Sequence, residues 1–391
     1  MEISWMTIIW LLPVAGFGGW LYGRHGSTSA ANSNQGRLHP EYFKGLNYVL
    51  NEQPDKAIEV FVKMLEVDSE TVETHLALGN LFRRRGEVDR AIRIHQNLIA
   101  RPNLNQEQRA LALLELGMDY MKSGLLDRAE SLFNELVETG LYTISAFTEL
   151  LDIYQQEKDW KNAIKTARRL ELSSSRSLNK IIAQFYCEQA SELRMQGQNR
   201  AARELLKKAV NADQSCVRAS LIEADILKKE GKCKQAIRVY KRVEKQDAEY
   251  IPEAVSLMLE CYRELEKVGE FKSYLHVMVE THGGITPMIM LTELIAEQDG
   301  EEEAMKYITR ELKKRPTVRG VDRLIEYALV PAQGKAKDDL MTIKDLTGKL
   351  LEDRSIYKCN HCGFDAKSLH WQCPSCKNWN TVKPIHGVEG E

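Results

Sequence analysis

The sequence predicts an all-α protein: a solenoid of helical repeats, with one transmembrane helix at the amino end and a small four-cysteine metal-binding domain at the carboxyl end. Three observations lead to this prediction. They are an uncharged stretch near the amino end, a pattern that recurs roughly every 34 to 39 residues, and two C-x-x-C pairs near the carboxyl end. A chain of 391 residues is also long for one hydrophobic core, which agrees with several domains.

The amino end has the length and composition of a membrane span. Residues 3–22 carry no charge, and a helix of that length covers the hydrocarbon core of a bilayer. Tryptophan and tyrosine side chains lie near both ends, as expected at the two interfaces. The only charge before the apolar run is Glu2, whereas a cleaved secretory signal begins with basic residues. We therefore predict a transmembrane helix at residues 1–22.

Basic residues on the carboxyl side of this span set its orientation. Arg24, His25, Arg37 and Lys44 all follow the apolar run, and cationic flanks stay in the cytoplasm. The body of the chain is then expected on the cytoplasmic side. Residues 23–40 are mostly small and polar, which is typical of a flexible linker.

A repeated pattern fills the middle of the chain. Six segments align on one shared alanine, and some carry glycine in the first half and an aromatic residue three positions later. The alanines are Ala57, Ala91, Ala129, Ala163, Ala202 and Ala236; the glycines are Gly45, Gly79 and Gly117; the aromatic residues are Tyr48, Phe82, Tyr120 and Tyr154. This pattern resembles the tetratricopeptide repeat, in which two helices form each unit.

The resemblance implies an array at residues 41–316 with about eight repeats. Small residues allow the two helices of a repeat to cross closely, and aromatic residues fill the space between repeats. Gly86, Gly124, Gly197 and Gly231 are expected at left-handed turns after the first helices. Two repeats are degenerate: residues 254–281 keep Gly269 but place Tyr274 where alanine is expected, and residues 287–316 keep Ala304.

Such an array offers an extended protein-binding surface lined by its first helices, so no enzymatic activity is expected. The candidates for this surface are Leu46, Val49, Asn80, Arg83, Met118, Met121, Asp152, Gln155, Asp225 and Lys228. The run Arg83, Arg84 and Arg85 is interpreted as a solvated face, because isolated charge runs are usually surface. Residues 317–354 show a helical pattern and are predicted to form a connector.

The carboxyl end carries the pattern C-x2-C-x10-C-x2-C, formed by Cys359, Cys362, Cys373 and Cys376. Two such pairs can direct four thiolates at one point, so we predict a tetrahedral metal site with these four ligands. Four thiolates leave no open coordination position, which indicates a structural site. Such sites accept iron or zinc, and the spacing does not choose between them. His361 and His370 are not needed as ligands.

We assign this domain to residues 355–386. So short a segment cannot bury a sufficient core, and the metal must contribute to its folding. Tyr357, Phe364, Trp371 and Trp379 are expected to cover the site. The segment resembles rubredoxin-like domains and short zinc ribbons. Rubredoxins usually carry glycine after the fourth cysteine, where this chain has Lys377, and this departure disfavours an electron-transfer role.

Composition limits the partners. The formal net charge is −2 with 28% charged residues, and this gives no basic footprint for DNA or RNA. The lysines and tryptophans of the metal domain could stack on bases, but we expect no nucleic-acid partner. The remaining cysteines, Cys187, Cys216, Cys233 and Cys261, are scattered and are expected to be buried free thiols. Cysteine usage agrees with a reducing compartment.

The order of these parts resembles the lipopolysaccharide assembly protein B family of Gram-negative bacteria. The resemblance implies a single-pass protein of the inner membrane with its amino terminus in the periplasm. It further implies an adaptor that regulates lipopolysaccharide biosynthesis by presenting the deacetylase LpxC to the membrane protease FtsH, and that is inhibited by the membrane protein YejM (PbgA). The metal ligands carried over are the four cysteines named above.

Two other interpretations remain open. The chain could be a scaffold that gathers lipopolysaccharide synthesis and export proteins without directing proteolysis, or, from the rubredoxin likeness, an electron-transfer protein. A homodimer is compatible with each of them.

Overall fold

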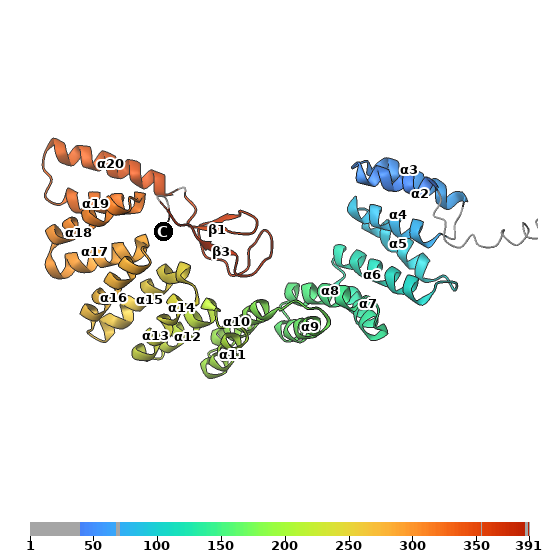
Figure 1. The fold of residues 1–391 in the computed structure, drawn as a ribbon, viewed down its shortest axis with the longest axis horizontal. Coiled ribbons are helices and arrows are strands. Elements are labelled where there is room, and N and C mark those ends of the chain that lie inside the picture. Colours follow the sequence, from blue (N-terminus) through green and yellow to red (C-terminus); the bar gives the residue numbers. More distant parts are fainter. Residues whose placement is uncertain (1–39, 68–70, 353, 388–389, 391) are drawn as a thin grey trace, which may run out of the picture. The chain divides into compact units, whose positions relative to one another are not determined.

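The computed structural model describes residues 40–67, 71–352, 354–387 and 390. These residues form a succession of helices and, near the carboxyl end, a small three-stranded sheet (Figure 1). The transmembrane helix expected at residues 1–22, and residues 23–39 of the expected linker, lie outside the described residues. Within the part that is described, no helix is both long and apolar enough to cross a membrane.

From Pro40 to Lys314 the described residues form eight consecutive helical hairpins, which confirms the all-α repeat fold. The first helices are α2 (Pro40–Leu50), α4 (Val72–Arg84), α6 (Gln106–Lys122), α8 (Thr143–Gln156), α10 (Asn179–Met195), α12 (Val217–Lys229), α15 (Ile251–Glu264) and α17 (Ile285–Asp299). The second helices are α3 (Pro54–Val67), α5 (Val88–Ile99), α7 (Leu126–Thr139), α9 (Trp160–Ser173), α11 (Asn199–Ala212), α13 (Cys233–Tyr240), α16 (Val268–Thr281) and α18 (Glu301–Lys314). After α13, the short α14 (Arg242–Gln246) and the 3-10 turn η2 (Ala248–Tyr250) lead into α15.

The chain divides into two compact units, residues 1–149 and residues 150–391, which we call unit 1 and unit 2. In unit 1, helices α2 to α7 pack in chain order, each against the next. In unit 2, the helices from α9 onward do the same. Unit 2 then continues with a further hairpin, α19 (Val318–Leu329) and α20 (Lys335–Glu352). Asp322 of α19 accepts hydrogen bonds from Lys344 and Thr347 of α20, each at 2.6 Å.

The shared alanine occupies the same position in every hairpin that carries it. It is the fourth residue of the second helix, and it is completely buried in α3, α5, α7, α9, α11, α13 and α18. In α16 the fourth residue is Phe271, which is also fully buried. The expectation that Tyr274 replaces the alanine of this repeat was wrong: Phe271 takes that place, and Tyr274 lies one turn later.

The glycines of the first helices permit close helix crossing, as predicted. A Cβ atom on Gly117 would lie 2.5 Å from Cε1 of Phe133, and one on Gly45 would lie 2.6 Å from Cε1 of Phe61. Both phenylalanines are fully buried. A side chain at these glycines would therefore collide with the ring that holds the second helix in place.

The turn inside each of the first seven hairpins uses one left-handed residue, placed two positions before the second helix. Gly86, Gly124, Gly197 and Gly231 adopt it with φ between 71° and 83°, as the sequence predicts. Glu52, Lys158 and Glu266 adopt it with φ between 55° and 59°. Gly269 lies inside α16 instead. The turn geometry is thus common to these repeats even where glycine is absent.

The carboxyl-terminal sheet is antiparallel, with strand order β2-β1-β3. Its strands are β1 (Tyr357–Cys359), β2 (Asp365–Ala366) and β3 (Val382–Pro384). Tyr357 lies opposite Ala366 on one side and Pro384 on the other. We call residues 355–386, which contain this sheet, the ribbon. Figure 1 shows the ribbon beside the helices of unit 2.

Candidate metal centre and its docking face

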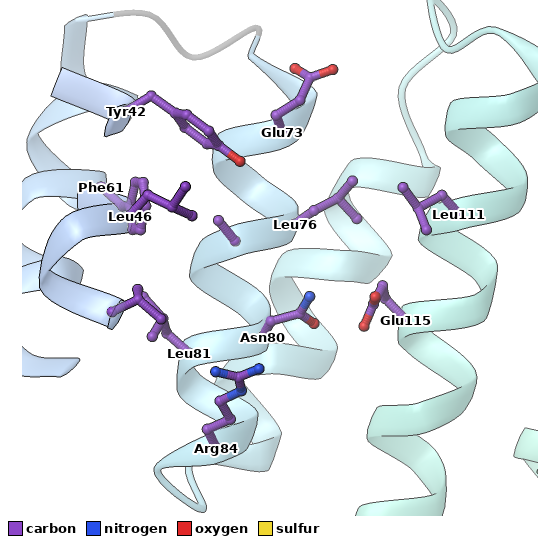
Figure 2. Close-up of a pocket in the computed structure, with 12 residues that line it drawn as sticks. Tyr42, Leu46, Phe61, Glu73, Leu76, Asn80, Leu81, Arg84, Leu111 and Glu115 are labelled. Atoms are coloured by element: carbon purple, nitrogen blue, oxygen red, sulfur yellow. The ribbon is translucent and has the colours of Figure 1, made fainter. Parts of the chain in front are cut away.

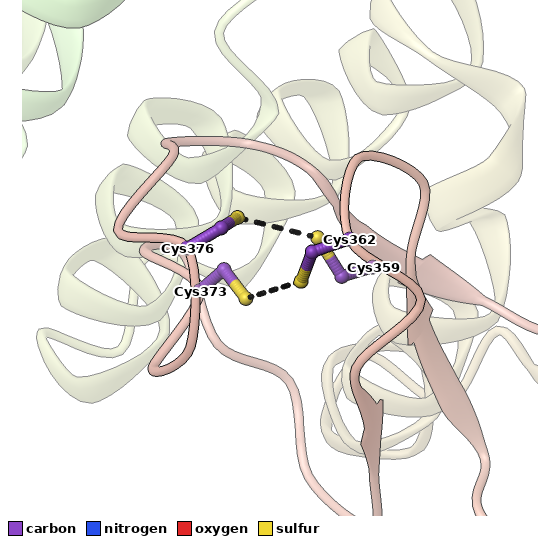
Figure 3. A group of neighbouring side chains, drawn as sticks. All are labelled: Cys359, Cys362, Cys373 and Cys376. Atoms are coloured by element: carbon purple, nitrogen blue, oxygen red, sulfur yellow. Dashed lines mark hydrogen bonds between the residues drawn. The ribbon is translucent and has the colours of Figure 1, made fainter. Parts of the chain in front are cut away.

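The four cysteine sulfur atoms of the ribbon lie together (Figure 3). The Sγ atoms of Cys359 and Cys376 are 3.8 Å apart, and those of Cys362 and Cys373 are 3.7 Å apart. All four lie within 4.8 Å of one another. Zinc–sulfur bonds of about 2.3 Å in a tetrahedron separate the sulfur atoms by about 3.8 Å. The spacing therefore fits a tetrathiolate metal ion, and it is equally compatible with iron and zinc.

Two similar turns position the sulfur atoms. In the first turn, the N–H of Gly363 donates to the carbonyl of Cys359 at 2.9 Å, and in the second the N–H of Lys377 donates to the carbonyl of Cys373 at 2.9 Å. Both residues are left-handed, with φ of 78° at Gly363 and 59° at Lys377. Lys377 therefore differs from the rubredoxin glycine in residue type but keeps the backbone conformation that the turn requires.

The local environment lowers the pKa of some of these thiols. The backbone N–H and the side-chain amide of Asn378 hydrogen-bond to the sulfur of Cys376 and hold its pKa at about 6. Burial raises the pKa of Cys373 to about 11. At Cys359, burial opposes ionisation, but hydrogen bonds from Thr381 and from nearby backbone N–H groups outweigh it and lower the pKa. Thiolates are the form that binds metal.

Two of the four expected aromatic residues cover the sulfur cluster. Tyr357 and Phe364 pack against the buried group of Cys359, Cys373 and Val382. Trp371 and Trp379 do not lie in that group: they face the helices of unit 2. The expectation that all four rings cover the metal site was wrong for the two tryptophans, which attach the ribbon to the repeat array.

Trp379 inserts between α8, α9 and α10. Its indole N–H donates to Oε1 of Gln155 at 2.9 Å. Its ring meets Trp160 edge to face at 6.2 Å and Phe185 at 5.9 Å between centroids. Trp160 and Phe185 are buried, so Trp379 completes an aromatic cluster within the array.

Trp371 stacks on the fully buried Tyr250, with 5.4 Å between ring centroids and 29° between planes. The Tyr250 hydroxyl lies 3.1 Å from both Asn380 Oδ1 and the carbonyl oxygen of Val382, to which it can donate. Burial raises the pKa of Tyr250 well above its usual value, with nearby carboxylates such as Asp247 adding to the effect. The phenol stays protonated and keeps its role as donor.

Charged contacts surround these rings. Lys383 forms ion pairs with Asp247 and, at 3.1 Å, with Glu249, and Tyr357 is hydrogen-bonded to Glu253. Arg218 of α12 is buried, pairs with Glu188 at 2.8 Å, and places its guanidinium about 6 Å from the rings of both Trp371 and Trp379. The ribbon is therefore bound through apolar, polar and charged contacts to helices α8, α9, α10, α12 and α15 and to residues 247–250, which precede α15. We call the array residues that it contacts the docking face.

Apart from Arg83, the residues predicted to face partners divide into four groups. Gln155 belongs to the docking face. Asp225 pairs with Arg194 at 2.5 Å, and Lys228 pairs with Glu260 at 2.7 Å, so both bind within the array. Leu46, Val49 and Asn80 line a cavity of unit 1. Met118 and Met121 are half-buried, and Asp152 is exposed.

Arg83 contradicts the solvated-face interpretation of the arginine run. Its side chain is 14% exposed and pairs with Glu115 at 2.6 Å and with the fully buried Asp119 at 2.7 Å. Asp119 is also in contact with His95, with 2.6 Å between the Nδ1 atom of His95 and the Oδ2 atom of Asp119. His95 occupies the place that Phe61 and Phe133 take in neighbouring repeats. Arg84 and Arg85 are exposed, as predicted.

The four cysteines outside the ribbon are buried free thiols, as expected. The Sγ atoms of Cys187 and Cys216 lie 3.8 Å apart. Cys233 donates to Glu264 at 2.8 Å, and burial raises its pKa to about 12. Cys233 is therefore protonated at neutral pH. Cys261 lies in the hydrophobic core of unit 2.

The fold and the site define a class: a tetratricopeptide-repeat protein with a rubredoxin-type module docked on its array. Family models agree with this class. The tetratricopeptide repeat matches residues 74–109 and 187–251, a PPR repeat matches residues 119–141, and the rubredoxin metal binding domain matches residues 357–384.

Full-length relatives identify the family. Lipopolysaccharide assembly protein B of Escherichia coli K12 is 42% identical over 381 residues, which cover 97% of this chain and 98% of that protein. The Haemophilus influenzae protein of the same name is 35% identical over 389 residues, with the same coverage. The chain belongs to the lipopolysaccharide assembly protein B family. Among solved structures, the C-terminal part of a tetratricopeptide-repeat protein from Cytophaga hutchinsonii has a TM-score of 0.42 and 13% identity, over 62% of this chain and 95% of that chain.

Proposed function

We propose that the chain is a non-catalytic adaptor, anchored in the inner membrane, that regulates lipopolysaccharide biosynthesis. In this proposal it presents the deacetylase LpxC to the membrane protease FtsH for degradation, and the membrane protein YejM (PbgA) inhibits it. Membership of the lipopolysaccharide assembly protein B family carries the proposal. The repeat array supports it, because such arrays bind other proteins through the surface of their first helices.

The proposal keeps the predicted division of the chain. Residues 1–22 form the single membrane span with the amino terminus in the periplasm, and residues 23–40 form the linker. The array at residues 41–316, the connector at 317–354 and the ribbon at 355–386 lie in the cytoplasm. Anchoring raises the effective concentration of a bound cytoplasmic client near a membrane enzyme, so the chain needs no chemistry of its own.

Within this proposal, Cys359, Cys362, Cys373 and Cys376 hold one iron or zinc ion. The 3.7–3.8 Å sulfur spacing and the two hydrogen-bonded turns support that role. A bound metal would supply folding free energy to a segment too short for a core of its own. Through the docking contacts of Trp371, Trp379 and Lys383, the folded ribbon then stabilises the docking face of unit 2.

The half-life of LpxC in cells tests the adaptor role. Deleting residues 1–22 should lengthen the half-life, because the client no longer meets the protease at the membrane. A matched variant carries an unrelated single span of the same orientation in place of residues 1–22, and separates anchoring from specific contacts of the native span. An unchanged LpxC half-life in the deletion variant, with its soluble part still folded, would contradict the proposal.

A scaffold for lipopolysaccharide synthesis and export proteins is the second candidate, and the name of the relatives, lipopolysaccharide assembly protein B, favours it. Cross-linking in native membranes discriminates between the two. Recovery of synthesis and export proteins without the protease would favour the scaffold. Loss of partners in a Cys359→Ser, Cys362→Ser variant would identify those that need the ribbon.

A further inference from the structure

Unit 1 has an open cavity of about 340 Å³ on its first helices α2, α4 and α6 (Figure 2). Its apolar wall includes Leu46, Leu76 and Leu111. Leu46 is 39% exposed, and its neighbours on the same face of α2, Phe43 and Leu50, are 56% and 76% exposed. Three large apolar side chains are thus exposed on one helix of eleven residues, which favours an apolar ligand in the cavity.

The polar residues of the cavity define a direction. Glu73 lies at one end of α4 and Arg84 at the other (Figure 2). Neither forms an ion pair within the described part of the chain. Glu115, in contrast, is neutralised by Arg83 at 2.6 Å, and Arg85 pairs with Asp55 at 2.5 Å. One anion and one cation are therefore left for a ligand, at opposite ends of an apolar groove.

Asn80 indicates which backbone conformation the ligand has. Its Oδ1 atom is buried and has no hydrogen-bond partner among the described residues, although the side chain lines the cavity. A buried acceptor without a partner is unfavourable, and a rotation of the amide toward the cavity would let a backbone N–H of a ligand donate to it. A helical ligand keeps its N–H groups for its own hydrogen bonds, whereas an extended peptide can donate one.

The geometry points to this groove as a binding site for an extended peptide segment with aliphatic residues at its centre, a basic residue facing Glu73 and an acidic residue facing Arg84. The two charges are eleven residues apart on α4, about 16 Å along the helix. In an extended chain only residues an even number of positions apart point to the same side. Four residues cover about 13 Å, and the long lysine and glutamate side chains cover the rest. The inference deepens the proposed adaptor role by naming the chemistry of the client segment, and it rests on that role only for the client's identity.

Peptide binding to the purified full chain in lipid nanodiscs tests the inference. The probe is the fluorescein-labelled peptide AKLVLEA with both ends blocked, and its control is AELVLKA, in which the charges are exchanged. Fluorescence anisotropy should show that the native chain binds the first peptide about tenfold more tightly than the second. The double variant Glu73→Lys, Arg84→Glu should reverse this preference. Arg85→Glu, a charge change outside the groove, should leave it unaltered.

Several outcomes would overturn the inference. One is that the native chain binds neither peptide at about 1 mM. Another is that the double variant keeps the native preference. Dimerisation of the chain that Leu46→Asp abolishes would assign the groove to a second copy. Binding to vesicles of anionic lipid that Leu46→Asp abolishes, without peptide binding, would assign it to the membrane surface. Each result leaves the half-life test of the adaptor role independent, because that test does not use the peptides.

Discussion

Removing the Trp379 side chain should weaken the attachment of the ribbon to the repeat array and loosen α10. In the Trp379→Ala variant the indole N–H bond to Gln155 is lost, together with the edge-to-face contacts to Trp160 and Phe185. The substitution leaves the four cysteines and both hydrogen-bonded turns of the ribbon in place. It therefore separates the docking of the ribbon from the binding of its metal.

The size of the effect follows from these contacts. A hydrogen bond of this kind contributes about 1 kcal/mol, and each aromatic pair contributes about 1 kcal/mol beyond its area. Together they amount to about 3 kcal/mol, at the lower end of the range for Trp→Ala substitutions. A half-buried ring agrees with that lower end. About 3 kcal/mol corresponds to a roughly 100-fold change in an opening equilibrium.

Hydrogen–deuterium exchange followed by mass spectrometry measures this change. Amides of α10 should exchange up to about 100-fold faster in Trp379→Ala, and amides of α4 to α6 in unit 1 should exchange as before. Trp379→Phe keeps a ring but loses the N–H donor, so its effect should be about 1 kcal/mol. A matched change at Gln155 to Leu should have a similar effect and add little to Trp379→Phe, because both remove the same bond.

Unchanged exchange of α10 in Trp379→Ala would refute this reasoning, because Trp379 would then contribute nothing to the stability of the docking face. An equal increase throughout unit 1 would also contradict it, since it would indicate general destabilisation. Retention of the metal in Trp379→Ala is required by the same account.

Three further predictions concern single positions. Gly117→Ala should lower the free energy of unfolding by about 1–3 kcal/mol, because the new methyl group collides with Phe133. Urea unfolding followed by circular dichroism measures this change. An unaffected midpoint would show that the crossing of α6 and α7 can relax. Lys158→Gly should raise the free energy of unfolding by about 0.5–1 kcal/mol, since φ is 59° there. Lys165→Gly, at an exposed position in the interior of α9, should lower it by about 1 kcal/mol. A loss at both positions would argue against left-handed strain. Cys373→Ser should abolish stoichiometric metal in elemental analysis, whereas Cys216→Ser, equally buried, should retain it; metal retained in Cys373→Ser would remove this residue from the ligand set.

The features predicted correctly are those that depend on local spacing. The shared alanines, the turn glycines and the two C-x-x-C pairs recur at fixed offsets, because a helical hairpin and a metal-binding turn each impose their own geometry on nearby residues. Tyr274 was wrongly expected at the alanine position because it lies five residues after Gly269, the spacing that separates turn glycine and alanine in other repeats. The left-handed turn residue of this repeat is Glu266, and Phe271 lies five residues after it.

The docking of the ribbon could not be predicted, because its contacts join residues far apart in the sequence. Trp379 and Gln155 are 224 positions apart, and Lys383 and Asp247 are 136 apart. No period or motif links such pairs. One feature of the sequence does indicate docking. The metal domain of about thirty residues carries two tryptophans in addition to the two rings that cover its sulfur atoms. Arg83 was misinterpreted for a similar reason, because its partners Glu115 and Asp119 lie in the next repeat.

The central claim is that a metal held by four cysteines folds the ribbon, and that the folded ribbon stabilises the docking face of the array. Hydrogen–deuterium exchange of the full chain before and after removal of the metal by a chelator tests it most directly. After removal of the metal, amides of residues 355–386 should lose protection and α10 should exchange faster, whereas the helical circular dichroism signal should stay nearly unchanged. Full protection of residues 355–386 after the metal has left would contradict it, as would collapse of the whole helical signal.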